Sequence, residues 1–296
     1  MSSLSVVVPR VGTDDLFEHT LASILRYRMP HHQVVVVQSD LQTDTYGLED
    51  EVEFVEVAGK PNLARYFNTM LEVVTGDAIN VIRPGVEVTH QWFAQGVRYL
   101  QSESIGCVAC SLVAANYRDE VISCGLITGR SMLPRHATQS RQRPLGPSSW
   151  AGLYRRSVLE AIGPFDDSIS NELFALDLGL SIQGLGADCG VITDRVLTLA
   201  RPELLDLAAR SRTGRDAQRM TQRHLSAEHQ RIGGLVALGS DCLTNLWRPS
   251  RWQQLAGRLG ARNKQAADRA FSRRLAITKH ELSAVSPIEK RGRRAA

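Results

Sequence analysis

Short apolar runs alternate with amphipathic stretches along the first two hundred residues. Ser5–Val8, Gln33–Val37 and Ala78–Ile82 are rich in β-branched and other apolar residues, which is typical of strands buried on both faces. Apolar residues at helical spacing lie between them, over Phe17–Ile24 and over Leu63–Val74. This alternation predicts an α/β domain with a mostly parallel, doubly wound central sheet that is covered by helices on both faces.

Ligands of such sheets bind beyond the carboxyl ends of the strands. Three segments of this chain follow predicted strands and would meet at that edge: Pro9–Arg10, Gln38–Asp44 and Arg83–Glu87. We therefore expect the functional residues of the domain to include members of these three segments.

Charge divides the chain into two parts. From Arg201 onward there are 20 Lys and Arg residues against 8 Asp and Glu, a net charge of +12, and the whole chain carries +4, so the earlier part carries −8. We place a boundary there, between a domain over residues 1–201 and a basic extension over residues 202–296. Apolar positions such as Phe271 and Leu275 predict that the extension is helical.

The basic extension has two candidate roles, and a third, nucleic-acid binding, is disfavoured. Its helices could pack their apolar stripe on the domain or on a second copy of the chain, which is the interpretation we favour. They could instead lie on anionic lipid. Nucleic acid is not expected as a partner, because there is no recognisable reader motif and little aromatic interleaving.

Composition narrows the class of protein further. An apolar content of 43% with 22% charged residues excludes wholesale disorder. No run approaches the roughly 18–20 apolar residues of a membrane-spanning helix, and Met1–Arg10 does not look like a secretory signal. The five cysteines are odd in number and scattered, unlike a disulfide framework. The expected location is the cytoplasm, with peripheral contact at the inner face of the membrane as an alternative.

Six segments between Ser5 and Arg201 carry a family resemblance through their order. The most specific is Arg155–Asp167, RRSVLEAIGPFDD, and the other five are Ser5–Pro9, Val34–Asp44, Asn62–Asp77, Ile82–Phe93 and Ile105–Gly125. Together they resemble the family 2 glycosyltransferases, which use nucleotide sugars and have the GT-A fold. In that family the segment that matches Arg155–Asp167 reads Arg-Arg, followed further on by Gly-Gly-Phe-Asp-Glu. In this chain Pro164 stands in place of the second glycine.

The resemblance implies a nucleotide-diphosphate-sugar donor and a glycan or lipid-linked acceptor. The candidate donor-binding residues are Pro9, Arg10, Asp40, Arg65, Asn68 and Arg83. Trp150 is the candidate acceptor-binding residue, because its ring could stack on a sugar, although a buried aromatic side chain would have the same sequence context.

The metal-binding positions of the family are altered in this chain. Carboxylates in the loop after the third strand normally hold a divalent cation, and the matching positions are Arg83 and Gly85. A guanidinium repels a hard cation, and no histidine occurs between His136 and His224 to match the family's later histidine. We therefore expect no divalent metal at the usual place, with Arg83 neutralising the diphosphate directly. Alternatively, Arg83 is a surface charge.

The general base of the family is altered as well. Counting from Phe165, its Glu-Asp pair falls on Phe174 and Ala175, neither of which accepts a proton. The nearest carboxylates, Glu172 and Asp177, are the candidate catalytic residues, although Asp177 could equally be structural. Two functions follow: a transferase for hexosyl or deoxyhexosyl groups, or an inactive relative that serves as a binding or scaffold module in polysaccharide biosynthesis.

Overall fold

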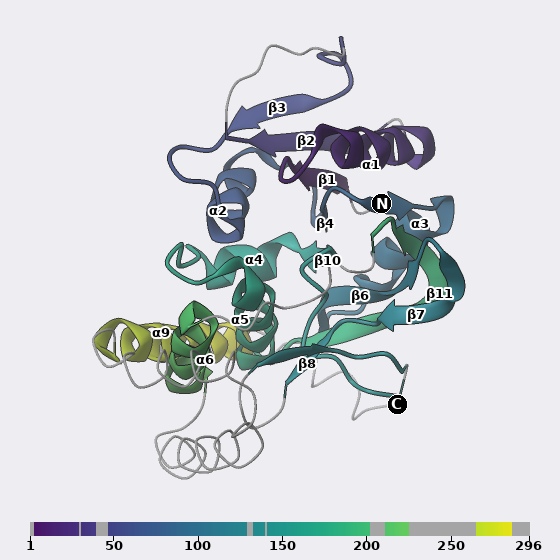
Figure 1. Ribbon diagram of the computed structural model, residues 1–296. Helices are drawn as coiled ribbons and strands as arrows, with labels where there is room; N and C mark the ends of the chain where they lie inside the picture. The colour runs from purple at the N-terminus through teal and green to yellow at the C-terminus, as the bar shows by residue number, and fades with distance from the viewer. Residues whose placement is uncertain are drawn as a thin grey trace, which may run out of the picture.

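The computed structural model describes residues 3–29, 31–39, 47–128, 133–139, 141–201, 211–224 and 265–285. A large curled sheet lies at its centre (Figure 1). The strands are β1 (Leu4–Pro9), β2 (Gln33–Gln38), β3 (Glu53–Glu56), β4 (Ala78–Ile82), β5 (Val86–Val88), β6 (Ile105–Ala114), β7 (Tyr117–Ser123), β8 (Leu126–Thr128), β9 (Pro134–His136), β10 (Ala151–Arg155) and β11 (Asp188–Leu199). The helices are α1 (Asp14–Tyr27), α2 (Leu63–Val73), α3 (His90–Tyr99), α4 (Arg156–Ile162), α5 (Asn171–Gly184), α6 (Ser211–His224) and α9 (Gln265–Val285).

The sheet has the strand order β3-β2-β1-β4-β10-β6-β11-β5, with β7 paired to β6. The ladders from β3 to β4 are all parallel, and Val7 of β1 pairs with Val35 of β2 and Val81 of β4. Beyond β4 the sheet is mixed, because β10 runs antiparallel to both β4 and β6 whereas β6 and β11 are parallel. The predicted α/β fold is confirmed, and its parallel character is concentrated around β1.

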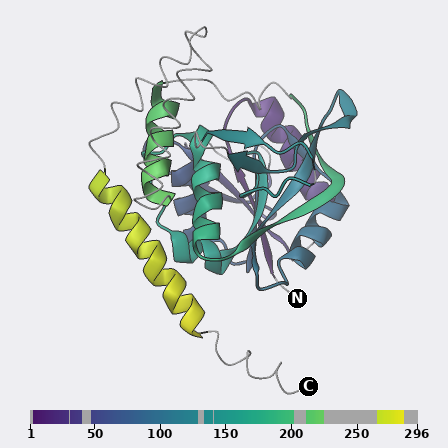
Figure 2. The same cartoon turned by 90° about the horizontal axis from the view of Figure 1, so that it is seen from below.

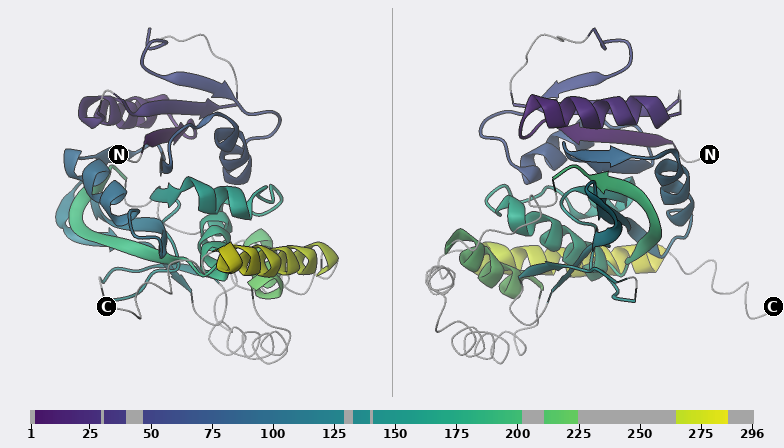
Figure 3. Two further views of the ribbon diagram at one scale, coloured as in Figure 1. Left: turned by 180° about the vertical axis from the view of Figure 1, so that it is seen from behind. Right: turned by 45° about the vertical axis from the view of Figure 1, so that its right-hand side comes forward.

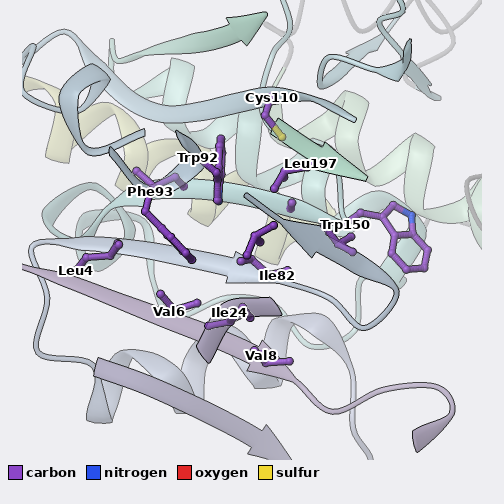
Figure 4. Close-up of a cluster of buried hydrophobic side chains, with 14 of the residues drawn as sticks. Leu4, Val6, Val8, Ile24, Ile82, Trp92, Phe93, Cys110, Trp150 and Leu197 are labelled. Carbon is purple, nitrogen blue, oxygen red and sulfur yellow. The ribbon is translucent and has the colours of Figure 1, made fainter. Parts of the chain in front are cut away.

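Helices cover both faces of the sheet, as expected. One face carries Val6 and Val8 of β1 against α1 and α3, and Trp92 of α3 is fully buried there. Figure 4 shows this cluster, with Trp92 and Phe93 of α3 above Leu4, Val6 and Val8 of β1. The opposite face carries Val7 against α2, α4 and α5. Successive residues of β1 thus face opposite cores, because side chains alternate along a strand.

Helix α5 is buried on most of its circumference. Leu173, Phe174, Leu176 and Leu178 are all buried, so the helix has no wide polar face. The reason lies in its neighbours: α5 contacts α2, α4 and the sheet on one side and α6 and α9 on the other. Figures 2 and 3 show α6 and α9 side by side against α5.

The described part of the basic extension is helical. It consists of α6 and α9, and Leu275 of α9 is buried against α5 as part of the α2–α5 core. The separation into units 1–201 and 202–296 stays a prediction. Among the helices described, none has the length and apolar character needed to cross a bilayer.

Candidate functional site

Arg10 follows β1 at the carboxyl edge of the sheet, and its guanidinium is held by several groups. Nη1 donates to Oε1 of Gln38 at 3.2 Å, and Nη2 pairs with Oδ1 of Asp14 at 2.9 Å. The same guanidinium lies 5.0 Å from the ring centre of Phe17. The Arg10 side chain is 16% exposed, so its charge is partly desolvated and reaches the surface at this edge. Pro9, directly before it, is the last residue of β1.

Arg83 follows β4, the strand next to β1. Its guanidinium lies 4.3 Å from the ring centre of Trp150, within the range of a cation–π contact. The backbone N–H of Arg83 also donates to the carbonyl of Trp150 at 2.8 Å. Because β1 and β4 are adjacent parallel strands, Arg10 and Arg83 emerge at the same edge. The two predicted donor-binding arginines therefore belong to one region of the structure.

Tyr66 of α2 is a buried residue beside Arg10 that the sequence did not single out. Its hydroxyl donates to the carbonyl of Arg10 at 3.3 Å, and the residue is buried. Burial raises the pKa of Tyr66, and the positive charge of Arg83 opposes that rise, which places Arg83 within electrostatic reach of the phenol. The available signal was the place of Tyr66 between Arg65 and Asn68, two candidate donor-binding residues on one predicted helix.

A tight turn connects Arg83 to Val86. The N–H of Val86 donates to the carbonyl of Arg83 at 3.2 Å, and Gly85 has φ +96°. Proline at the second position and a positive φ at the third are typical of a type II turn. The N–H of Gly85 donates to Oγ1 of Thr20 at 2.9 Å, which fastens the turn to α1. The turn therefore presents Arg83 at its start and has no side chain at position 85.

Arg65 and Asn68 of α2 contact a different segment from Arg10 and Arg83. Arg65 forms an ion pair with Asp167 at 2.7 Å, and its Nη1 donates to the carbonyl of Ala58 at 2.8 Å. The amide of Asn68 forms two hydrogen bonds with the backbone of Phe165, at 2.8 and 3.0 Å. Both side chains thus hold the loop that contains Phe165 and Asp167 against α2.

Phe174 and Ala175, which stand where the family has its general base, lie in an apolar environment that includes other aromatic rings. Phe174 is buried with its ring 4.9 Å from that of Phe67 and 5.7 Å from that of Phe165. Ala175 is buried as well. A cavity of about 10 Å³ remains beside Phe174 and Ala175, and Ser148 and Ser149 also line it.

Asp177 is part of a buried group of charges that joins α5 to the C-terminal helices. We call it the ionic cluster, and its members are Asp166, Asp177, Arg219, Arg223, His224 and Asp268. Arg223 donates to both oxygens of Asp177 at 3.1 Å, and Nε2 of His224 lies 2.6 Å from Oδ1 of the same carboxylate. Burial raises the pKa of Asp177, but the bond from His224 and the charge of Arg223 outweigh it and leave the pKa below its ordinary value.

Arg219 connects the same cluster to the loop before α5. Its guanidinium pairs with Asp166 at 2.5 Å and with Asp268 at 3.2 Å, and the Asp268 side chain is fully buried. Burial raises the pKa of Asp166, but hydrogen bonds from Ser168 and the charge of Arg219 outweigh it and lower the pKa to about 2. The opposite net charges of the two parts of the chain were the one signal of this cluster in the sequence. They did not indicate which arginine pairs with which carboxylate.

Two candidate residues fall wholly or partly outside the described residues. Asp40 belongs to residues 40–46, which the structure does not describe. Glu172 lies in the first turn of α5, and only its backbone is described. The roles of both stay predictions.

Known structures with the same arrangement are nucleotide-sugar enzymes. The mannosyltransferase PcManGT from Pyrobaculum calidifontis, solved with GDP-mannose and Mn²⁺, has 17% identity and a TM-score of 0.54; the match covers 94% of this chain and 87% of that one. GalNAc-T7, solved with UDP, GalNAc and Mn²⁺, has 12% identity and a TM-score of 0.58, covering 75% of this chain and 48% of that one. This chain therefore matches about half of GalNAc-T7. No family model and no curated protein matches the sequence.

These structures correct the expectation that no divalent cation takes part. Both neighbours are solved with Mn²⁺, so a divalent cation is present in proteins with a similar fold, contrary to what Arg83 and Gly85 suggested. In this chain the turn after β4 offers a guanidinium, a proline ring and a glycine, none of which suits Mn²⁺. Within the described ranges no three His, Cys, Asp or Glu side chains lie close enough to hold a cation.

The likeness extends over most of the chain at low sequence identity, so it bears on architecture. The α/β architecture, with parallel ladders around β1 and helices on both faces, agrees with the GT-A-like fold that the six segments led us to expect. The chain has a GT-A-like α/β fold.

Proposed function

We propose that this protein is a glycosyltransferase that moves a sugar from a nucleotide-diphosphate sugar to a glycan or lipid-linked acceptor. The observation that carries the proposal is the pair of guanidinium groups, Arg10 and Arg83, at the carboxyl ends of adjacent strands. Ligands of open α/β sheets bind at this edge. Guanidinium pairs with phosphate oxygens through two parallel hydrogen bonds, which suits a diphosphate. The neighbours with the same fold are solved with GDP-mannose or with UDP.

The roles we propose follow from the contacts of each residue. Arg10 and Arg83 bind the diphosphate, and we keep Pro9 and Asp40 as donor-binding residues, as the sequence indicates. A leaving diphosphate gains negative charge as the glycosidic bond breaks, and fixed cations at that point stabilise the transition state. Arg65 and Asn68 support the site by holding the loop around Phe165 against α2.

Two carboxylates, Glu172 and Asp177, are candidates for the general base. The surroundings of Asp177 favour a structural role, because an ion-paired carboxylate with a lowered pKa is a weak proton acceptor. Glu172 lies two residues before Phe174 at the start of α5, so we prefer it. Glu172→Gln should reduce turnover while leaving donor affinity and melting temperature unchanged, whereas Asp177→Asn should lower the melting temperature.

A second function is supported by one observation. The family's Glu-Asp pair is replaced by Phe174 and Ala175, and the ring of Phe174 packs on Phe67 and Phe165. This loss of the general base favours a module that binds the donor or a glycan without turning it over. The comparisons give no support to this alternative, because both neighbours named above are solved with nucleotide or nucleotide-sugar ligands and Mn²⁺.

One titration series separates the two functions. The full chain is titrated by calorimetry and thermal shift with uridine, thymidine and guanosine diphosphate sugars, each with and without Mn²⁺. A ligand at 100 times its Kd stabilises the folded state by about 2.7 kcal/mol, a measurable shift. Binding followed by release of the nucleoside diphosphate supports the transferase. Binding without turnover supports the module, and the absence of binding by every donor contradicts both.

We further propose that the outer face of α9 contacts anionic lipid and so brings the protein to a lipid-linked acceptor. Ile277 is 60% exposed on this helix, and the exposed Arg273 lies one turn before it on the same face. An exposed apolar residue beside a cation suits a helix on a lipid surface. Sedimentation with vesicles containing phosphatidylglycerol, compared with purely zwitterionic vesicles, tests this contact. A second copy of the chain on the same face would appear as a dimer in ultracentrifugation.

A further inference from the structure

Trp150 has a place in the structure that differs from that of an exposed sugar platform. The residue is 8% exposed and belongs to the apolar cluster on the α1–α3 face of the sheet. Figure 4 shows it at the edge of that cluster, beyond Ile82 of β4. Most of its surface is therefore already covered by protein atoms, and a stacked sugar would need an open ring face.

Both the indole ring and the backbone carbonyl of Trp150 contact Arg83. The indole lies 4.3 Å from the guanidinium carbon, and the Trp150 carbonyl accepts the backbone N–H of Arg83 at 2.8 Å. The next residue, Ala151, pairs with Ile82, so the strand register holds the two residues opposite each other. Backbone and side chain of Arg83 are thus both fixed by one residue, which limits the conformations open to a long, flexible side chain.

The second arginine of the site is held in the same way. Arg10 lies over the ring of Phe17, which is buried in the same apolar cluster as Trp150. Each cation at the carboxyl edge therefore rests on an aromatic ring that the core itself fixes. This arrangement orders both guanidinium groups before a ligand arrives, and a ligand then loses less free energy in ordering them.

We propose that Trp150 is a positioning residue that orients the Arg83 guanidinium for an oxyanion of the diphosphate class. The inference rests on the proposed function, since it assigns the diphosphate to Arg83. It differs from the expectation that Trp150 binds the acceptor, because the indole acts through Arg83 and touches no sugar.

Inorganic pyrophosphate is the probe, because it has the diphosphate and lacks base, ribose and sugar. Its affinity is measured by calorimetry for the full chain and for Arg83→Ala, Trp150→Leu and the double variant. We expect Trp150→Leu to weaken binding about fivefold, since the ring no longer holds the cation, and Trp150→Phe to weaken it less than about twofold. In the Arg83→Ala background Trp150→Leu should have no further effect, because coupled residues are not additive.

Phe93→Leu controls for damage to the core. Phe93 is buried in the same cluster on α3, so this variant should lose stability but bind pyrophosphate as the parent does. Additive effects of the two site substitutions, or pyrophosphate binding unchanged by Trp150→Leu, would overturn the inference, and so would a parent protein that binds no pyrophosphate. A different result would contradict the proposed function alone: a chain that binds pyrophosphate but binds no nucleotide sugar.

Discussion

Removing Arg223 tests whether the ionic cluster fastens the C-terminal helices to the domain. The Arg223 side chain is 4% exposed, and it pairs with Asp177 and Asp268 while its guanidinium lies 3.7 Å from the ring centre of Phe271. Arg223→Met keeps the length of the side chain and removes the charge. Asp177, whose side chain is 8% exposed, then keeps His224 as its described partner.

The magnitude follows from the cost of an uncompensated buried charge. Removing one partner of a buried ion pair costs about 3–5 kcal/mol, whereas an exposed pair contributes about 0–1 kcal/mol. We expect Arg223→Met to lower the free energy of unfolding by about 3–5 kcal/mol, which corresponds to a fall in melting temperature of about 10 °C for a chain of this size. Arg156→Met is the matched control, because Arg156 pairs with Glu160 near the surface.

The assay is urea unfolding followed by circular dichroism. It includes the double variant Arg223→Met/Asp177→Leu, which removes both charges of this ion pair, while Asp268 keeps Arg219 and His224 loses the Asp177 carboxylate. Replacing a buried pair by apolar residues is often neutral or stabilising, so the double variant should recover part of the loss. The reasoning is refuted if Arg223→Met loses no more stability than Arg156→Met, or if the double variant loses at least as much as the two single variants together.

Three further predictions concern the site and the cluster. Arg83→Ala should weaken nucleotide-sugar binding about tenfold or more, a loss of ~1.4 kcal/mol, in calorimetry, with Arg156→Ala unchanged. The lowered pKa of Asp166, about 2 in the folded state, contributes stability that is present above the ordinary value near 3.8 and is lost as pH falls towards 2. Melting temperature should therefore decline over that range, and less steeply in Asp166→Asn. Gly85→Ala should destabilise the fold by about 1–2 kcal/mol in urea unfolding because φ is +96° there; an unchanged midpoint would contradict the turn's role.

The strands and helices of the domain could be predicted because their pattern is local. The runs Ser5–Val8, Gln33–Val37 and Ala78–Ile82 became β1, β2 and β4 with ends shifted by at most one residue. Strands of a central parallel sheet are apolar throughout, and helices show one apolar stripe, so a few consecutive residues carry the signal. The order of these elements was enough to predict that Arg10 and Arg83 follow neighbouring strands at one edge of the sheet.

Contacts across long stretches of chain were decided by the tertiary structure. Nothing near Trp150 in the sequence indicates that its ring would meet Arg83, because the antiparallel entry of β10 beside β4 brings them together. Phe174 joins the aromatic cluster through Phe67, which belongs to α2.

The charges follow the same rule. Composition alone revealed an acidic domain and a basic extension, since counting needs no geometry. Which arginine meets which carboxylate depends on how α6 and α9 pack against α5: Asp177 meets Arg223 and Asp166 meets Arg219 across about fifty residues. A buried ion pair requires that both partners lose water at one point in space, and sequence spacing does not encode that point.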